Sequence, residues 1–94
     1  MMRAQVNSVG NRVTLKVCGR LANGYVQELE NCWRSARADH PESKISVDLQ
    51  HVTFIDDKGC SLLERMHRDG ATFAVAGLMT RSIIDKIVRN EGIN

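Results

Sequence analysis

Two neighbouring aspartates and a lysine occupy the middle of the stretch FIDDKGCSLL, residues 54–63. Carboxylate pairs serve in hydrolases as the acid and the base of the reaction. Adjacent residues at the end of a strand usually point in different directions, however, because side chains alternate between the two faces. No histidine or lysine elsewhere in the sequence is clearly placed to complete an acid–base pair, so Asp56 and Asp57 are not predicted to be catalytic.

Cysteine and histidine side chains offer a second kind of chemistry. Cys60 and His67 would lie on one face of the same helix, where they could bind a metal together with His51. A zinc site needs more ligands than this, at defined spacing. The phosphate-binding loop G-x-x-x-x-G-K-[ST] and the dinucleotide fingerprint G-x-G-x-x-G are both missing from the sequence. We therefore expect no metal, no cofactor and no enzymatic activity.

The composition is that of one soluble globular domain. The 94 residues are enough for a single domain, residues 1–94, and 43% of them are apolar while 26% are charged. The net charge is only +2 and the basic residues are scattered, so nucleic acid is not an expected partner. The apolar runs are far shorter than a membrane span, and we expect no direct membrane insertion.

The cysteines Cys18, Cys32 and Cys60 are odd in number and lack C-x-x-C spacing. Together with the missing signal peptide, this predicts reduced, structural thiols in a cytoplasmic protein. Cys32 in particular is expected on the buried face of a helix.

The N-terminal part of the chain predicts a β-hairpin. Residues 12–18 alternate apolar and polar side chains, which is the period of a half-buried strand. Residues 5–9 form a weaker strand before them, and Gly10-Asn11 supplies the turn. Further along, residues 44–49 and the short run 52–55 have strand character.

Three segments, near 24–38, 57–69 and 79–90, have the apolar spacing of amphipathic helices. The first is predicted to bury Leu29, Cys32, Trp33 and Ala36, and to expose Glu28, Glu30, Arg34 and Arg37. The second would bury Gly59, Leu62, Leu63 and Met66, and the third Met79, Ile83, Ile84, Ile87 and Val88. Gly70 and Gly92 are predicted to end the second and third helices.

Strands and helices thus alternate, and this order predicts an α/β fold with a mixed, largely parallel sheet. The nearly all-apolar segment 71–76 is typical of a strand covered on both faces. In such sheets functional groups gather beyond the carboxyl ends of the parallel strands. FIDDKG lies at one of these ends, which makes it the expected position of a site.

The simplest interpretation of this junction is structural. Asp57 can be the N-cap of the second helix by accepting the amide hydrogens of residues 59 and 60, which is worth about 1 kcal/mol. Gly59 can let that helix approach the first helix closely. This interpretation gives no role to Asp56 or Lys58.

The residues also resemble a known family over nearly the whole chain. The segments VTLKVCGRL, KISVDLQHVTFIDDKGCSLLERM and GATFAVAGLMTRSIIDKI are similar to the STAS domain, found in sulfate transporters and anti-sigma factor antagonists. The combination V-D-L-x-x-V-x-F-I-D-x-x-G-x-x-L-L, followed by a glycine, an apolar strand and another glycine, carries the resemblance. It implies a mixed, largely parallel sheet of four to five strands flanked by helices.

The resemblance further implies a stand-alone, non-catalytic protein-binding module in bacterial partner switching. In such antagonists a serine or threonine directly after the motif aspartate is phosphorylated by a kinase that doubles as an anti-sigma factor. The unphosphorylated antagonist binds that kinase and frees the sigma factor, which regulates transcription. In this chain Asp56 matches the motif aspartate and Gly59 the motif glycine, while Asp57 stands at the phosphoacceptor position and cannot form a serine or threonine phosphate ester.

We therefore expect a protein partner, such as an anti-sigma factor kinase, that binds through Asp56, Asp57, Lys58, Gly59, Cys60 and Ser61. The neighbouring polar stripe Lys58, Ser61, Arg65 and Arg68 would add contacts, or would be a solvated helix face. The alternative is a small STAS subunit of a membrane transport complex for lipids or anions. Nucleotide binding at the helix N-terminus is a third possibility, which Asp57 disfavours by its charge. The expected oligomeric state is a monomer or a weak dimer.

Overall fold

The structure is a computed structural model that describes residues 2–75 and 77–93 of the chain. These residues form a four-stranded sheet with the strand order β1-β2-β3-β4. β1 runs antiparallel to β2, whereas the β2–β3 and β3–β4 pairs are parallel, which confirms the predicted mixed, largely parallel α/β sheet. In chain order the elements are β1 (Met2–Val9), β2 (Arg12–Leu21), α1 (Gly24–Asp39), β3 (Lys44–Ile55), α2 (Asp57–Arg68), β4 (Thr72–Ala74) and α3 (Leu78–Ile93).

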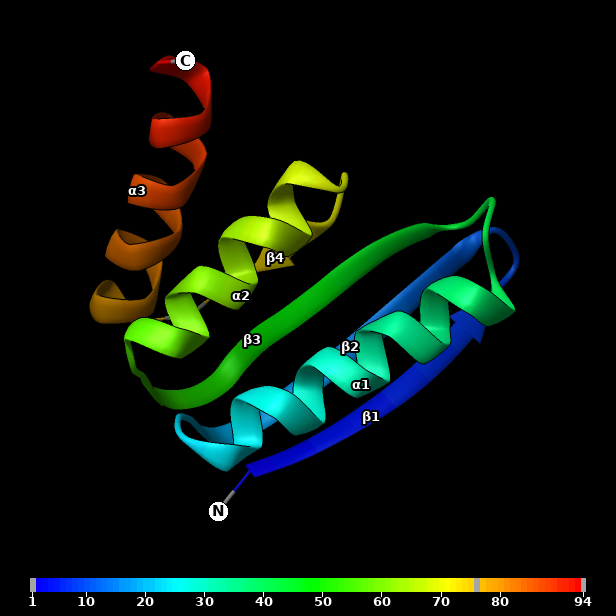
Figure 1. Ribbon diagram of the computed structural model, residues 1–94, viewed down its shortest axis with the longest axis horizontal. Helices are drawn as coiled ribbons and strands as arrows, with labels where there is room; N and C mark the ends of the chain where they lie inside the picture. The colour runs from blue at the N-terminus through cyan, green and yellow to red at the C-terminus, as the bar shows by residue number, and fades with distance from the viewer. Residues whose placement is uncertain (1, 76, 94) are drawn as a thin grey trace.

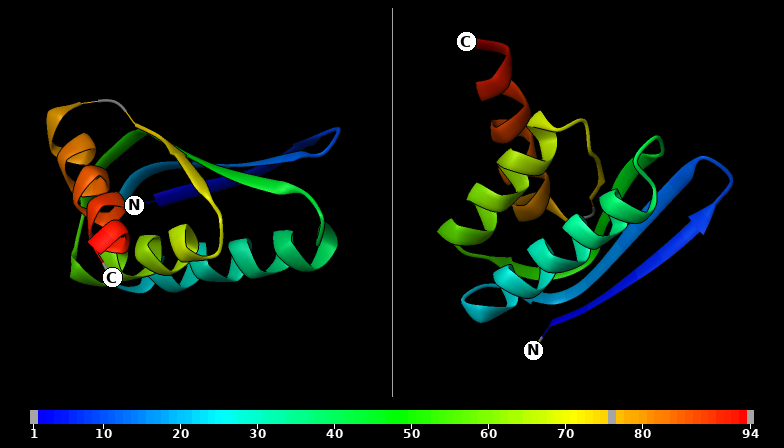
Figure 2. Two further views of the ribbon diagram at one scale, coloured as in Figure 1. Left: turned by 90° about the horizontal axis from the view of Figure 1, so that it is seen from above. Right: turned by 45° about the vertical axis from the view of Figure 1, so that its right-hand side comes forward.

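The helices α1 and α2 lie side by side on one face of the sheet, and α3 lies next to α2 (Figures 1 and 2). The core forms between this helix layer and the inward-facing side chains of β2 and β3, because a sheet face and a helix stripe bury their apolar surfaces together. Its fully buried members are Val13, Leu15, Val17, Leu21, Leu29, Val47, Leu49, Leu62, Leu63 and Met66. The predicted stripe of α2 is therefore confirmed.

The opposite face of the sheet carries no helix in the part of the chain that the structure describes (Figure 2). Much of this face is polar: Lys16 is paired across the strands with Asp48, and the hydroxyls of Ser46 and Thr72 are 3.0 Å apart. The prediction of a strand covered on both faces at 71–76 is thus wrong. β4 is only Thr72–Ala74, and residue 76 lies outside the described residues.

The strands β1 and β2 form the predicted hairpin, with its turn at Gly10-Asn11. Val9 pairs with Arg12 across the two-residue turn, and Gly10 has a φ of 59°. A positive φ at the first central residue is what a tight hairpin of the II′ type requires, and glycine adopts it without steric cost. The first strand is longer than predicted because it begins at Met2, which is buried.

β3 is one twelve-residue strand, although its sequence predicted two shorter runs. The strand continues through the polar residues at its centre, and the pairing register with β2 shifts there. His51 pairs with Cys18 while Asp48 pairs with Lys16, so β3 has one more residue than β2 in this interval. Such a bulge leaves the extra residue outside the regular pairing without ending the strand.

The helix ends show how a glycine acts in two different ways. Gly70 has a φ of 100° and follows α2, and the amides of Gly70 and Ala71 donate to the carbonyls of His67 and Met66 at 3.0 Å each. This is the Schellman arrangement, so the predicted stop is confirmed. Gly92 instead lies within α3, and the predicted stop there is wrong. A glycine costs a helix only about 1 kcal/mol relative to alanine and does not end it alone.

The inner faces of α1 and α3 differ in part from the prediction. Trp33 is 9% exposed and belongs to the core, as expected, whereas Cys32 is only half-buried. In α3, Ile84 and Ile87 are buried but Val88 is 46% exposed. The side chains of residues 79 and 80 lie outside the described residues. No helix in residues 2–75 and 77–93 is long and apolar enough to cross a membrane.

Candidate functional site

Asp56, not Asp57, is the N-cap of α2. Its backbone is extended, with φ −89° and ψ −178°, and its Oδ1 accepts a hydrogen bond from the amide of Gly59 at 2.7 Å. Its Oδ2 accepts a second hydrogen bond, from the amide of Asn23 at 2.9 Å. One carboxylate therefore caps α2 and also holds the start of α1. The predicted cap at Asp57 is wrong by one residue.

The end of the sheet explains why the cap falls on Asp56. Ile55 is still paired with Leu21, the last residue of β2, and the amide of Asp56 donates to the carbonyl of Leu21 at 3.1 Å. This bond keeps Asp56 in an extended conformation, which is the backbone that an N-cap needs. The helix can begin only at the next residue, so Asp57 becomes its first residue and is exposed.

Gly59 is buried against the end of β2. A Cβ atom at this position would lie 2.7 Å from the carbonyl oxygen of Leu21, 3.0 Å from Cγ2 of Ile55 and 3.1 Å from Cγ of Leu21. Only glycine fits there without a shift of the backbone. The close approach that the sequence predicted at Gly59 is real, but it is made to the strand end and not to the first helix.

The remaining residues of the junction point outward. Asp57, Lys58 and Ser61 are exposed, and we call these three residues the tip. Cys60 is half-buried, and burial, followed by the nearby carboxylates of Asp57, Glu64 and Asp56, raises the pKa of its thiol above the ordinary value. The thiol is therefore protonated at neutral pH and is a poor nucleophile. The structure thus separates Asp56 and Gly59, which hold the fold, from the tip.

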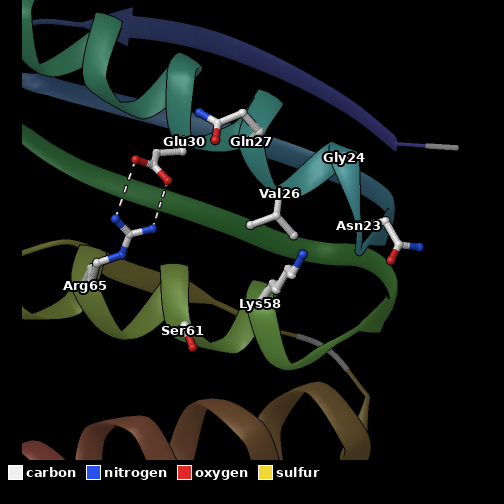
Figure 3. Close-up of a pocket in the computed structure, with 8 residues that line it drawn as sticks. All are labelled: Asn23, Gly24, Val26, Gln27, Glu30, Lys58, Ser61 and Arg65. Carbon is white, nitrogen blue, oxygen red and sulfur yellow. Dashed lines mark hydrogen bonds and ion pairs between the residues drawn. The ribbon is translucent and has the colours of Figure 1, made fainter.

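A groove of about 450 Å³ lies between α1 and α2, beside the tip (Figure 3). Lys58 and Arg65 extend into it from α2, while Val26 and Glu30 face it from α1. The residues that line this α1–α2 groove are Asn23, Gly24, Val26, Gln27, Glu30, Lys58, Ser61 and Arg65. Of the polar stripe predicted on α2, Arg68 is exposed but does not line the groove.

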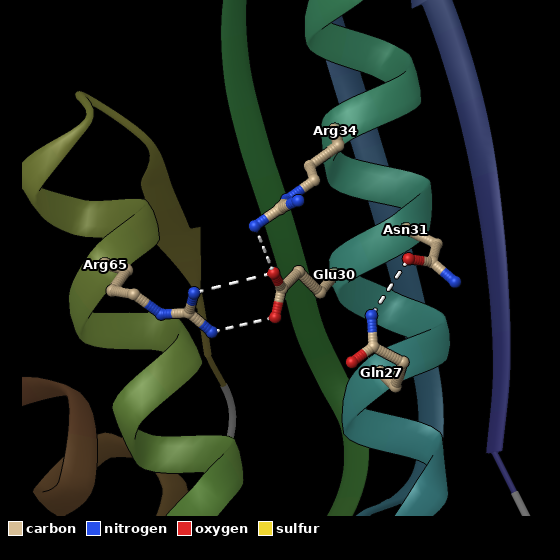
Figure 4. Close-up of polar contacts among 5 residues, drawn as sticks. All are labelled: Gln27, Glu30, Asn31, Arg34 and Arg65. Carbon is tan, nitrogen blue, oxygen red and sulfur yellow. Dashed lines mark hydrogen bonds and ion pairs between the residues drawn. The ribbon is translucent and has the colours of Figure 1, made fainter.

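Glu30 is buried, although its place in the sequence predicts a position on the outside of α1. Its exposed fraction is 9%. Its Oε1 accepts a hydrogen bond from Nη2 of Arg65 at 2.8 Å, and its Oε2 lies 2.7 Å from Nη2 of Arg34 (Figure 4). Arg65 lies on α2, so this ion pair joins the two helices across the groove. The Glu30–Arg34 spacing of four residues hinted at a pair, but the contact with Arg65 depends on the fold.

The carboxyl groups of Glu30 and Asp56 both have pKa values below the ordinary value. Hydrogen bonding from Arg65 lowers the pKa of Glu30, burial opposes it, and the charges of Arg65 and Arg34 add to the lowering. The amide of Asn23, then that of Gly59, lowers the pKa of Asp56. A carboxyl group whose pKa is lower in the folded than in the unfolded state stabilises the protein at pH values above its unfolded-state pKa. That contribution is lost as the pH falls through the folded-state pKa.

We expect this loss to be visible as an acid-sensitive melting temperature. In the wild type, the melting temperature should fall as the pH is lowered below the ordinary pKa of a carboxyl group. The variant Glu30→Gln, which cannot ionise, should be less stable at neutral pH and should show a shallower decline in acid. Thermal unfolding followed by circular dichroism over a pH series measures both effects.

The control for this prediction is Glu28→Gln, because Glu28 is an exposed glutamate on the same helix. Its pH profile should match that of the wild type. If Glu30→Gln also has the wild-type profile, the Glu30–Arg65 pair does not contribute to stability.

Several charged side chains of this region are committed to structural contacts. Within residues 2–75 and 77–93, no three His, Cys, Asp or Glu side chains come together in a way that could hold a metal ion, and Cys60, His67 and His51 do not form such a cluster. Asp56 is committed to two backbone amides, and Glu30 to two arginines. What remains available is the tip and the partly charged α1–α2 groove next to it.

No protein-family model and no curated protein sequence matches this chain. Its fold matches that of the anti-sigma factor antagonist SpoIIAA in its unphosphorylated form, with a TM-score of 0.68 and 19% identity over 88% of this chain and 82% of that one. A DUF3478-family protein of Shewanella loihica with a SpoIIAA-like fold matches with a TM-score of 0.57 and 13% identity, over 84% of this chain and 71% of that one.

A third structure, that of Mglu, matches with a TM-score of 0.60 and 24% identity. The match covers 79% of this chain but only 19% of Mglu, so the chain spans about a fifth of that protein's length. These likenesses show that the chain has a SpoIIAA-like, and hence STAS-like, fold. The fold alone does not specify a function, because one fold can present different sites.

Proposed function

We propose that this chain is a non-catalytic protein-binding module that acts in partner switching in the manner of an anti-sigma factor antagonist. Its docking surface is the tip, Asp57, Lys58 and Ser61, together with the α1–α2 groove. The observation that carries this proposal is the separation of roles at the β3–α2 junction. Asp56 and Gly59 fix the backbone, while Asp57, Lys58 and Ser61 are exposed and the last two line a groove.

The tip carries a permanent negative charge in this proposal. A phosphoserine carries roughly −1.5 to −2 charges at neutral pH, whereas the carboxylate of Asp57 carries one and needs no kinase. Because Asp57 makes no contribution to the cap, its side chain is available to a partner. We therefore expect a protein partner with a basic group facing Asp57 and an acidic group facing Lys58. The binding mode would be fixed and not cycled by phosphorylation at this position.

The test is calorimetric titration of the protein with the anti-sigma-factor-like kinase domains encoded in the same genome. Wild type should bind one of them, and Asp57→Lys should bind it at least about tenfold more weakly, which corresponds to about 1.4 kcal/mol. Asp57→Ser, which removes the charge alone, should have an intermediate affinity. Circular dichroism should show that both variants remain folded, because Asp57 is exposed and is not the N-cap.

The matched control is Asp39→Lys, which makes the same charge change at the exposed far end of α1. That helix has sixteen residues, so the two changes are separated by a helix length of about 24 Å. Asp39→Lys should bind like wild type. Equal affinity of wild type and Asp57→Lys, or no binding to any such kinase, would contradict the proposal.

A further inference from the structure

Asn23 has an unusual backbone conformation at the start of α1. Its φ is 55° and its ψ is −130°, and it is the one non-glycine residue with a positive φ among those that the structure describes. Glycine tolerates this region, but an asparagine there is under strain. The residue after it is Gly24, and the exposed side chain of Asn23 makes no capping hydrogen bond.

The surrounding fold imposes this conformation. The amide of Asn23 donates to Oδ2 of Asp56 at 2.9 Å, which ties the residue to the β3–α2 junction. Its carbonyl accepts a hydrogen bond from the amide of Val26 at 3.2 Å, and the amide of Tyr25 donates to the carbonyl of Ala22 at 3.1 Å. The backbone is therefore held on both sides of the Asn23 Cα atom.

The ψ angle has a specific chemical consequence. Around the Cα–C bond of an L residue, Cβ lies about 120° away from the backbone nitrogen. A ψ of −130° therefore brings Cβ of Asn23 nearly into line with the amide nitrogen of Gly24. This eclipsed arrangement is the one found in a five-membered ring that contains Cα, Cβ, Cγ, the following nitrogen and the carbonyl carbon. The folded chain thus has the backbone geometry of a succinimide before any ring forms.

We propose that Asn23 is a site of spontaneous deamidation promoted by the fold. The amide nitrogen of Gly24 loses its proton and attacks Cγ of Asn23, which forms the N–Cγ bond of a succinimide. The Cγ–Nδ2 bond breaks, and Nδ2 takes up a proton and leaves as ammonia. Water then opens the ring at either carbonyl, which gives aspartate or isoaspartate at position 23.

Three further features favour this reaction. The nitrogen of Gly24 belongs to the first turn of α1, where amides have no partner within the helix and the helix dipole favours an anionic nitrogen. A Cβ added at Gly24 would meet no atom within 4 Å, so its surroundings are open. The side chain of Asn23 points away from the groove into solvent (Figure 3), and a rotation about its Cα–Cβ bond suffices to present Cγ to the nitrogen.

The product would change the wall of the α1–α2 groove, which Asn23 and Gly24 both line. Aspartate adds a negative charge to the residue whose amide donates to Asp56. Isoaspartate also adds a carbon to the main chain, which displaces the amide that donates to Asp56. The modification would therefore act on the same junction that holds α1 and α2 in place, and it would accumulate with the age of the molecule.

The test compares reaction rates in folded and unfolded contexts. The folded protein and a peptide of residues 20–27 are incubated together in mildly alkaline buffer at physiological temperature. Deamidation is followed by mass spectrometry of the tryptic peptide and by enzymatic methylation of isoaspartate. We expect the folded protein to react on the order of tenfold faster than the peptide, because its backbone is already restricted to the reactive geometry.

Gly24→Ala is the matched variant, since alanine fits at this open position but shields the nitrogen. It should lose most of the reaction without any decrease in melting temperature. Asn7, Asn11 and Asn31 are internal controls without a following glycine and should stay intact. If the folded protein reacts at the same rate as the peptide or more slowly, the fold does not promote the reaction and the proposal is wrong.

Discussion

Replacement of Gly59 with alanine is expected to destabilise the protein by about 2–3 kcal/mol, although alanine is the better helix former. Intrinsic propensity alone would favour alanine by about 1 kcal/mol. The added Cβ, however, would lie 2.7 Å from the carbonyl oxygen of Leu21, which is a backbone atom and cannot rotate away. The same oxygen accepts the hydrogen bond from Asp56, so any shift of the strand end would also disturb the cap. Urea unfolding measures the change.

Gly24→Ala provides the comparison. Gly24 also lies in the first turn of a helix, α1, but it has open space around it. It should leave the free energy of unfolding unchanged or raise it by up to about 1 kcal/mol. The two substitutions are chemically identical, but only Gly59→Ala should lower the free energy of unfolding. If Gly59→Ala is as stable as the wild type, the packing of α2 against Leu21 is looser than the structure shows.

Removal of the Asp56 carboxylate should have the second large effect. Asp56→Ala leaves the amides of Gly59 and Asn23 without their acceptor, and it removes the connection between the starts of α1 and α2. We expect the melting temperature to fall by several degrees. Asp56→Asn keeps one acceptor oxygen but loses the charge, and it should lie between wild type and Asp56→Ala. Differential scanning calorimetry of the variants measures these changes.

Asp57→Ala is the control for this prediction, since the two aspartates are adjacent and only one is the cap. Asp57 lies in the first turn of α2, where a negative charge contributes at most about 1 kcal/mol. Its replacement should change the melting temperature far less than that of Asp56. Equal losses in the two variants would mean that the cap is shared between them.

The sequence predicted those parts of the fold that are determined by residues close together in the chain. The Gly10-Asn11 turn with its alternating flanks produced the hairpin, and the glycine at position 70 produced the end of α2. The apolar spacing of Leu62, Leu63 and Met66 identified the buried face of α2. In each case the residues that determine the structure are within a few positions of one another, so periodicity and turn chemistry were sufficient.

The details of the site depend on contacts between distant segments, and the sequence pattern could not supply them. Either Asp56 or Asp57 could have capped α2, and the choice was made by the pairing of Ile55 with Leu21 at the sheet end. The burial of Glu30 depends on Arg65, which is thirty-five positions away. The dipeptide Asn23-Gly24 is typical of a turn, but its sequence does not show that asparagine and not glycine takes the positive φ.

The split between fixed and exposed positions at the β3–α2 junction has a use in protein engineering. Residues 57, 58 and 61 can be randomised in a displayed library while Asp56 and Gly59 are kept. Each member would then present different side chains on the same rigid helix start, next to the same groove. Under the proposed function, the same property would let natural selection alter partner choice at these positions one residue at a time. Such changes would leave the stability of the domain intact, because Asp56 and Gly59 hold the junction.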